Sequence, residues 1–185
     1  ATTDSYTLTQ DDVDKQLTVT ASYTDAFSNP HSVTSDPTAN ITNLADAPQG
    51  EVIISQATSP STEGDVLTAS NTLTDGDGMG VVNYQWNRSG VVIADATGTT
   101  YVLTQQDVGK TISVTASYTD GQNNLHSVTS AATPEIANAN DPLTGDLTLA
   151  RTPEEDEIIT LTTTLSDQDG IAQTLYQWHR DGQAI

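Results

Sequence analysis

The residues best suited to chemistry in this chain are aspartates that recur in turn-like sequences. The stretches "LTDGDG" at 73–78 and "LSDQDG" at 165–170 each place two aspartates two residues apart. Ca²⁺ prefers six to eight oxygen ligands at about 2.3–2.6 Å, and two carboxylates in one tight loop can point at one ion. We therefore expect calcium sites, with these candidate ligands: Asp46, Asp75, Asp77, Asp120, Asp141, Asp167 and Asp169.

A simple turn is the alternative interpretation of "DGDG", because Asp and Gly favour turns for conformational reasons alone. An EF-hand is excluded, since the full ligand series and the closing glutamate are missing. Backbone carbonyls could complete a calcium shell. Glu63 and Asp107, which we expect at the facing end of a neighbouring domain, could also contribute.

The histidines and tryptophans give weaker evidence of a site. His31 and His126 occupy equivalent strand positions, and the sequence shows no convergent partners for either, so we expect both on the surface. Trp86 and Trp178 each follow a tyrosine two residues earlier on the same strand face, which favours core packing over sugar stacking. The arginine two residues after each tryptophan is expected to form a structural ion pair.

Composition and motifs argue against several classes of function. The chain has 5 Lys plus Arg against 25 Asp plus Glu, a formal charge of −20, so nucleic acid is not an expected partner. No apolar run approaches the 18 residues of a membrane span, and there is no cysteine for disulfides or thiolate metal sites. No G-x-S-x-G or H-E-x-x-H motif occurs, and we predict no enzymatic activity.

The sequence repeats itself with a period of 92–95 residues. Tyr6–Asp25 and Tyr101–Asp120 are identical at 14 of 20 positions, at a shift of 95. "YQWNRSG" at 84–90 matches "YQWHRDG" at 176–182, at a shift of 92. A change in loop length accounts for the difference of three residues. Such periodicity predicts a chain of similar structural units.

Two linker-like stretches set the boundaries of these units. "TNLADAPQG" at 42–50 and "ANANDPLTG" at 137–145 combine Asn, Asp and Pro without apolar alternation. We expect the C-terminal half of one unit at 1–45, a complete unit at 46–138 and the N-terminal half of the next unit at 139–185.

The complete unit reads as an all-β sandwich. "TISVTASYT" at 111–119 alternates without a break, with its apolar side chains on one face. Six further short segments between turn signals also read as strands, at 51–55, 66–74, 82–86, 91–93, 100–104 and 125–130. Seven short strands in about 92 residues favour an immunoglobulin-like β-sandwich. In that fold, the loop with Asp75 and Asp77 and the loop with Asp120 lie at the same end of the sandwich as the linker with Asp46.

The motifs Y-Q-W, Y-x-L-T, D-V-G-K and N-D-P resemble the bacterial immunoglobulin-like and cadherin-like tandem repeats of large RTX-type, type I-secreted surface adhesins. The resemblance covers essentially the whole chain. It implies tandem sandwiches in an extracellular stalk at a bacterial surface, with calcium at the junctions as the stiffener. Fold and repeat type do not fix a ligand.

The leading functional hypothesis is a structural stalk or spacer. One alternative is an adhesive module that binds a glycan or a protein through its loop ends. A second alternative is an accessory domain of a secreted hydrolase. The expected partners are the neighbouring repeats of the same chain. The half-units at 1–45 and 139–185 could also pair head to tail between molecules, form a swapped dimer, or meet within one molecule.

Overall fold

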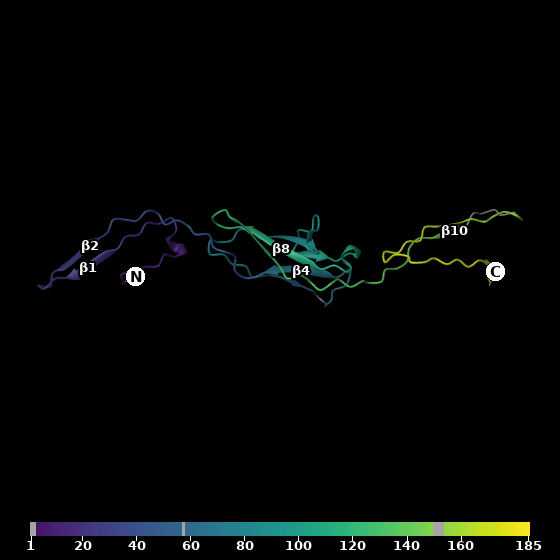
Figure 1. Cartoon of the computed structure of the whole chain (residues 1–185), viewed down its shortest axis with the longest axis horizontal. Helices are drawn as coiled ribbons and strands as arrows, with labels where there is room; N and C mark the ends of the chain where they lie inside the picture. Colours follow the sequence, from purple (N-terminus) through teal and green to yellow (C-terminus); the bar gives the residue numbers. More distant parts are fainter. Residues whose placement is uncertain (1–2, 57, 150–153) are drawn as a thin grey trace.

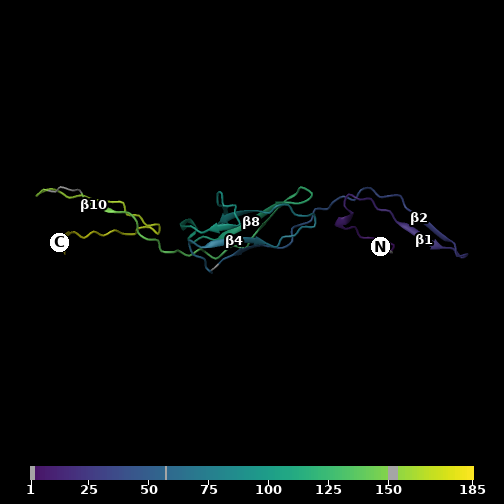
Figure 2. The same cartoon turned by 180° about the vertical axis from the view of Figure 1, so that it is seen from behind.

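The computed structural model describes residues 3–56, 58–149 and 154–185, and these residues form an all-β protein, as predicted. Figure 1 shows a two-sheet unit in the middle of an elongated chain, with an extended segment at either end. The same order is seen from behind in Figure 2. The helical elements of the described residues are 3-10 turns of three residues, so none of them is long and apolar enough to cross a membrane.

The central unit contains a strand within every segment predicted from the sequence. One sheet has the order β3-β4-β7 and the other has the order β6-β5-β8-β9, with every pairing antiparallel. The seven strands are β3 (Val52–Ser55), β4 (Val66–Asn71), β5 (Asn83–Arg88), β6 (Val91–Val92), β7 (Thr100–Val102), β8 (Ile112–Thr119) and β9 (Leu125–Thr129).

The core lies between the two sheets and follows the predicted alternation. Strand β8 buries four alternate residues, Ile112, Val114, Ala116 and Tyr118, each at most 2% exposed. Trp86 of β5 is fully buried, stacks on Tyr101 at a centroid distance of 5.7 Å, and donates its indole N–H to the carbonyl of Gly98. Leu67 and Ala69 of β4 close the opposite side. The expected core position of Trp86 is confirmed.

The segment before the central unit contains the 3-10 turn η1 (Gln10–Asp12) and the hairpin β1 (Thr20–Thr24) with β2 (Pro30–Thr34). This hairpin has the register of β8 with β9: Thr20 pairs with Thr34 as Thr115 pairs with Thr129. A second 3-10 turn, η2 (Gln105–Asp107), matches η1. The local structure of the sequence repeat is therefore retained.

The segment after the central unit repeats two other hairpins. Strands β10 (Leu147–Leu149) and β11 (Leu161–Thr163) pair as β3 pairs with β4, and β12 (His179–Arg180) pairs with β13 (Gln183–Ala184) as β5 pairs with β6. The expected core position of Trp178 is wrong here, because 41% of its surface is exposed. Among the described residues, no strand equivalent to β8 pairs with this segment.

The alternation of β4 gives a direct test of the core. Leu67 is fully buried, whereas 49% of its neighbour Val66 is exposed. We expect Leu67→Ala to lower the free energy of unfolding by about 2–5 kcal/mol, because it removes packed methyl groups and leaves a cavity. Val66→Ala is the matched control and should cost less than about 1 kcal/mol. Chemical denaturation measures both values, and equal effects would contradict this assignment of inward and outward faces.

Candidate functional site

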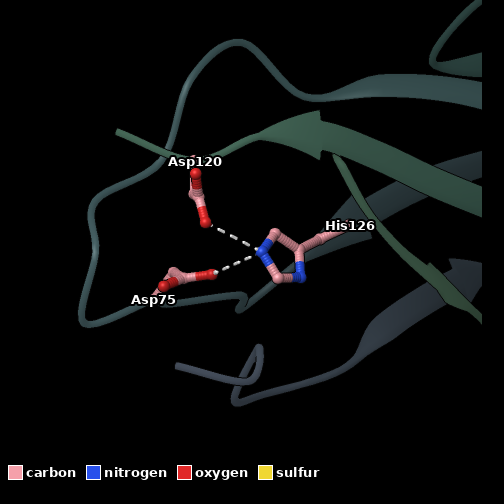
Figure 3. Close-up of side chains that lie close together, drawn as sticks. All are labelled: Asp75, Asp120 and His126. Carbon is pink, nitrogen blue, oxygen red and sulfur yellow. Dashed lines mark hydrogen bonds and ion pairs between the residues drawn. The ribbon is translucent and has the colours of Figure 1, made fainter. Parts of the chain in front are cut away.

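A compact polar cluster lies where three loops and strands of the central unit meet (Figure 3). Asp75 follows β4, Asp120 follows β8, and His126 lies on β9. The His126 Nε2 atom is 3.0 Å from Asp120 Oδ2 and 3.8 Å from Asp75 Oδ2. Both carboxylate side chains are 0% exposed, and the His126 side chain is 16% exposed. In the described part of the chain, this is the only group of three such residues close enough to hold a metal ion.

Hydrogen bonds within the protein already occupy this cluster. Asp120 Oδ1 accepts the backbone N–H groups of Gln122 and Asn124, at 2.8 and 2.7 Å, which fixes the β8–β9 turn. Asp75 Oδ2 accepts the Tyr118 hydroxyl at 2.6 Å and ties the loop after β4 to β8. These hydrogen bonds join the two sheets at one end of the central unit.

The surface position expected for His126 is therefore wrong, because its ring lies between two buried carboxylates and stacks on Tyr118 at 5.3 Å. The signal that sequence reasoning missed is the spacing of six residues between Asp120 and His126. That spacing recurs as Asp25 and His31, which lie 3.3 Å apart in the β1–β2 hairpin. The His31 side chain is 47% exposed, as expected for a surface histidine.

The Asp120 carboxyl and the Tyr118 hydroxyl have pKa values shifted in opposite directions. Burial opposes ionisation of Asp120, but hydrogen bonds from Asn124 and His126 outweigh it and lower its pKa to about 2. Burial and the hydrogen bond to Asp75 raise the pKa of Tyr118 to about 12. The carboxylate is therefore ionised and the phenol neutral across the physiological pH range.

A second group of carboxylates lies at the two linkers. The backbone N–H of Asp46 donates to Asp77 Oδ2 at 2.9 Å, and that of Asp141 donates to Asp169 Oδ2 at 2.8 Å. Each linker is thus held by the second aspartate of the following D-x-D turn. The first aspartate of each turn accepts the N–H of the second, at 2.9 Å for Asp75 and 3.0 Å for Asp167.

Several oxygens near the linkers are buried without a hydrogen-bond partner. They are Glu63 Oε2, Asp77 Oδ1, Gln105 Oε1 and Asp141 Oδ2. Asp77 as a whole is 7% exposed. Burial raises the pKa of Glu63, and the negative charges of Asp141, Asp169 and Asp107 raise it further. Glu63, from the central unit, therefore shares one negative field with the carboxylates of the following linker.

The seven predicted ligands are thus divided among three places. Asp75 and Asp120 meet at His126, whereas Asp46 with Asp77, and Asp141 with Asp167 and Asp169, lie at the first and second linkers. Of these seven aspartates, only Asp77 and Asp141 have a buried oxygen without a hydrogen-bond partner.

Asp107, a candidate calcium ligand in the sequence, has a structural role instead. Its carboxylate is 0% exposed, with Oδ1 accepting from Arg88 Nε at 2.6 Å. Its Oδ2 accepts from the Tyr101 hydroxyl and from the backbone N–H and hydroxyl of Thr104. Burial opposes ionisation, but these hydrogen bonds outweigh it and lower the pKa of Asp107. The ion pair expected for the arginine after Trp86 is confirmed.

Comparisons with protein-family models, with curated proteins and with solved structures found no match to this chain. The interpretation of these sites therefore depends on their own chemistry.

Removal of Arg88 tests the buried ion pair. We expect Arg88→Met to lower the free energy of unfolding by about 3 kcal/mol, because it leaves the Asp107 carboxylate buried without its cation. Arg180 has no ion pair among the described residues, so Arg180→Met is the matched control. Urea denaturation of both variants, monitored by tryptophan fluorescence, measures the difference. A loss below about 0.5 kcal/mol for Arg88→Met would contradict a structural role for the pair.

Acid titration tests Asp120. Because its folded pKa of about 2 lies below its ordinary value, its contribution to stability is complete above about pH 4 and is lost as the pH falls toward 2. We expect Asp120→Asn to lower the melting temperature at pH 7 and to have almost no effect near pH 2. A difference between wild type and variant that does not depend on pH would show that charge is not the cause.

Proposed function

We propose that this chain is a non-enzymatic spacer of tandem immunoglobulin-like sandwiches, part of an extracellular stalk at a bacterial surface. The strand order of the two central sheets supports this fold, because an immunoglobulin-like sandwich also divides seven strands between two antiparallel sheets. The repeated hairpin registers on either side support the tandem arrangement. In a tandem array each unit contacts mainly its neighbours, which suits extension and spacing.

Calcium is proposed to stiffen the junctions between these units. The observation that carries this proposal is the set of unpartnered buried oxygens beside the linkers, since a buried carboxylate oxygen without a donor is costly unless a cation faces it. Glu63, Gln105, Asp141 and Asp169 are the proposed ligands at the second junction, and they would have to move closer together to hold an ion, because only Asp75, Asp120 and His126 already lie that close among the described residues. Asp46 and Asp77 would contribute at the first. The D-x-D turns and Glu63 supply the hard oxygen ligands that Ca²⁺ prefers.

Glycan binding is a second candidate, supported by one groove. Trp178 and Tyr176 are 41% and 51% exposed, and both line a groove with Leu147, Leu149 and Leu161. Aromatic faces can stack on sugars, whereas Trp86 is fully buried and unavailable. A glycan array distinguishes the two functions: a specific signal abolished by Trp178→Ala would favour adhesion. An accessory role beside a secreted catalytic domain is compatible with the same spacer.

Thermal melting with and without calcium tests the stiffening role. Extracellular modules bind calcium at about 10⁻⁴–10⁻³ M, and a concentration ten times the dissociation constant stabilises the folded state by about 1.4 kcal/mol. We therefore expect about 10 mM Ca²⁺ to raise the melting temperature by roughly 5–10 °C relative to chelator. Small-angle X-ray scattering should show a narrower distribution of the radius of gyration in calcium, because the junction carboxylates no longer repel one another.

Two variants that each remove one negative charge test where calcium acts. Glu63→Gln should abolish most of the calcium-dependent shift, whereas Asp95→Asn should retain it, because the Asp95 side chain lies in an exposed turn and has no hydrogen bond among the described residues. Identical melting and scattering in calcium and chelator would refute the calcium proposal. Equal loss in both variants would show an effect of net charge alone.

A further inference from the structure

The cluster in Figure 3 holds two buried carboxylates beside one histidine. The side chains of Asp75 and Asp120 are 0% exposed, and although burial opposes ionisation, hydrogen bonds lower the pKa of Asp120 to about 2. Asp107 is buried to the same extent, but Arg88 pairs with it. Among the described residues, no lysine or arginine forms an ion pair with Asp75 or Asp120. Buried charges are normally paired or bound to a metal ion, so this contrast points to a cation from outside the chain.

A third carboxylate beside the cluster has a buried oxygen without a hydrogen-bond partner. Asp77 is 7% exposed, and its Oδ1 accepts no hydrogen bond within the described part of the chain. Its backbone joins the two loops of the cluster, because its N–H donates to Asp75 Oδ1 at 2.9 Å and its carbonyl accepts from Gly121, the neighbour of Asp120, at 3.1 Å. Three carboxylates are thus gathered at this end of the central unit, and the donors around them leave one oxygen unsatisfied.

The facing atoms of the cluster lie at distances suited to one small metal ion. Zn²⁺ binds nitrogen and oxygen ligands at about 2.0–2.2 Å in tetrahedral geometry, which places the ligand atoms about 3.3–3.5 Å apart. His126 Nε2 is 3.0 Å from Asp120 Oδ2 and 3.8 Å from Asp75 Oδ2, and the three atoms all lie within 4.8 Å of one another. Figure 3 shows this ring nitrogen directed toward both carboxylates.

We propose that Asp75, Asp120 and His126 bind a divalent transition-metal ion such as Zn²⁺. The imidazole nitrogen distinguishes this site from a calcium site, because Ca²⁺ takes six to eight oxygen ligands whereas Zn²⁺ is bound by His and Asp. His126 binds through Nε2 as the neutral ring with its proton on Nδ1, so the ion replaces the hydrogen bond to Asp120. The two carboxylates balance the charge of the ion, which cross-links the loop after β4 with the β8–β9 turn.

The surrounding residues hold the three ligands in orientation. Tyr118 donates its hydroxyl to Asp75 Oδ2 at 2.6 Å, and its ring stacks on His126. Asn124 donates its backbone N–H to Asp120 Oδ1 and its side-chain amide to Asp120 Oδ2. Such contacts around a metal site typically raise affinity by about tenfold to a hundredfold, because the ligands need not be reordered. The His126 side chain is 16% exposed, which leaves the ion a path from solvent.

Zinc titration of histidine variants tests this site. By isothermal titration calorimetry in about 10 mM Ca²⁺, we expect one Zn²⁺ to bind the wild-type chain. His126→Gln should weaken binding by about a hundredfold or more, because it removes the nitrogen ligand. His31→Gln is the matched control, since His31 has the same spacing from Asp25 but is 47% exposed and pairs with that carboxylate alone among the described residues. It should retain the wild-type affinity.

Glu63→Gln separates this site from the proposed calcium junction. It should retain zinc binding, because Glu63 is not among the three residues of the cluster. Wild type that binds no zinc, equal affinity of wild type and His126→Gln, or a loss of affinity in His31→Gln or Glu63→Gln would overturn the zinc proposal. None of these results depends on whether calcium raises the melting temperature.

Nitrogen-15 NMR of the histidine-labelled chain gives a readout on the wild type itself. The chain has three histidines, and Zn²⁺ should shift the Nε2 resonance of His126 while those of His31 and His179 stay unchanged. His31→Gln and His179→Gln assign the other two resonances. Zinc should also raise the melting temperature of wild type and not that of His126→Gln, because an ion that binds only the folded state stabilises it. A zinc-induced shift at another histidine, or at none, would overturn the proposal.

Discussion

The buried carboxylate of Asp107 is the constraint on which the central unit depends. It follows β7 of the three-stranded sheet, yet its ion pair is with Arg88 of β5 in the four-stranded sheet, so one side chain fixes the two sheets against each other. Tyr101 donates to the same carboxylate and stacks on Trp86, which links this polar contact directly to the apolar core. A buried charge with all its oxygens occupied tolerates little rearrangement, and it therefore specifies how the two sheets meet.

Hydrogen-bond donors also accompany other buried carboxylates of this chain, whose formal charge is −20. Several aspartate side chains are buried and accept hydrogen bonds. The donors are Arg88 for Asp107, His126 and backbone N–H groups for Asp120, and Tyr118 for Asp75. These carboxylates stabilise turns and joints within the unit. The linker carboxylates differ, because hydrogen bonds from the linker backbone occupy only part of their capacity. Buried carboxylates inside the central unit thus have hydrogen-bond donors for their oxygens, whereas Asp77 and Asp141 beside the linkers each retain a buried oxygen without one.

The strands and inward faces of the central unit could be predicted because they follow from local alternation, as in β8, where every second residue is buried. The two 3-10 turns were not predicted, although each has a local capping pair, Thr9 with Asp12 and Thr104 with Asp107. The partnership of Asp107 with Arg88 joins residues 19 positions apart and depends on tertiary packing. The division of the candidate ligands was also beyond sequence reasoning. Asp75 and Asp120 are 45 residues apart, and which of the nearby aspartates shares a site with His126 depends on tertiary packing.

The flanking segments separate what is local in this fold from what is not. Hairpin register recurs from repeat to repeat, because turn residues and cross-strand pairs specify it within a short stretch. Burial does not recur: Trp86 and Trp178 share the sequence Y-Q-W-x-R-x-G, and yet only Trp86 is enclosed. Trp86 is enclosed because β8 pairs beside β5 in the same sheet and Tyr101 of the opposite sheet stacks on its ring. Hairpin register is therefore encoded locally, whereas burial of the tryptophan depends on contacts with residues farther along the chain.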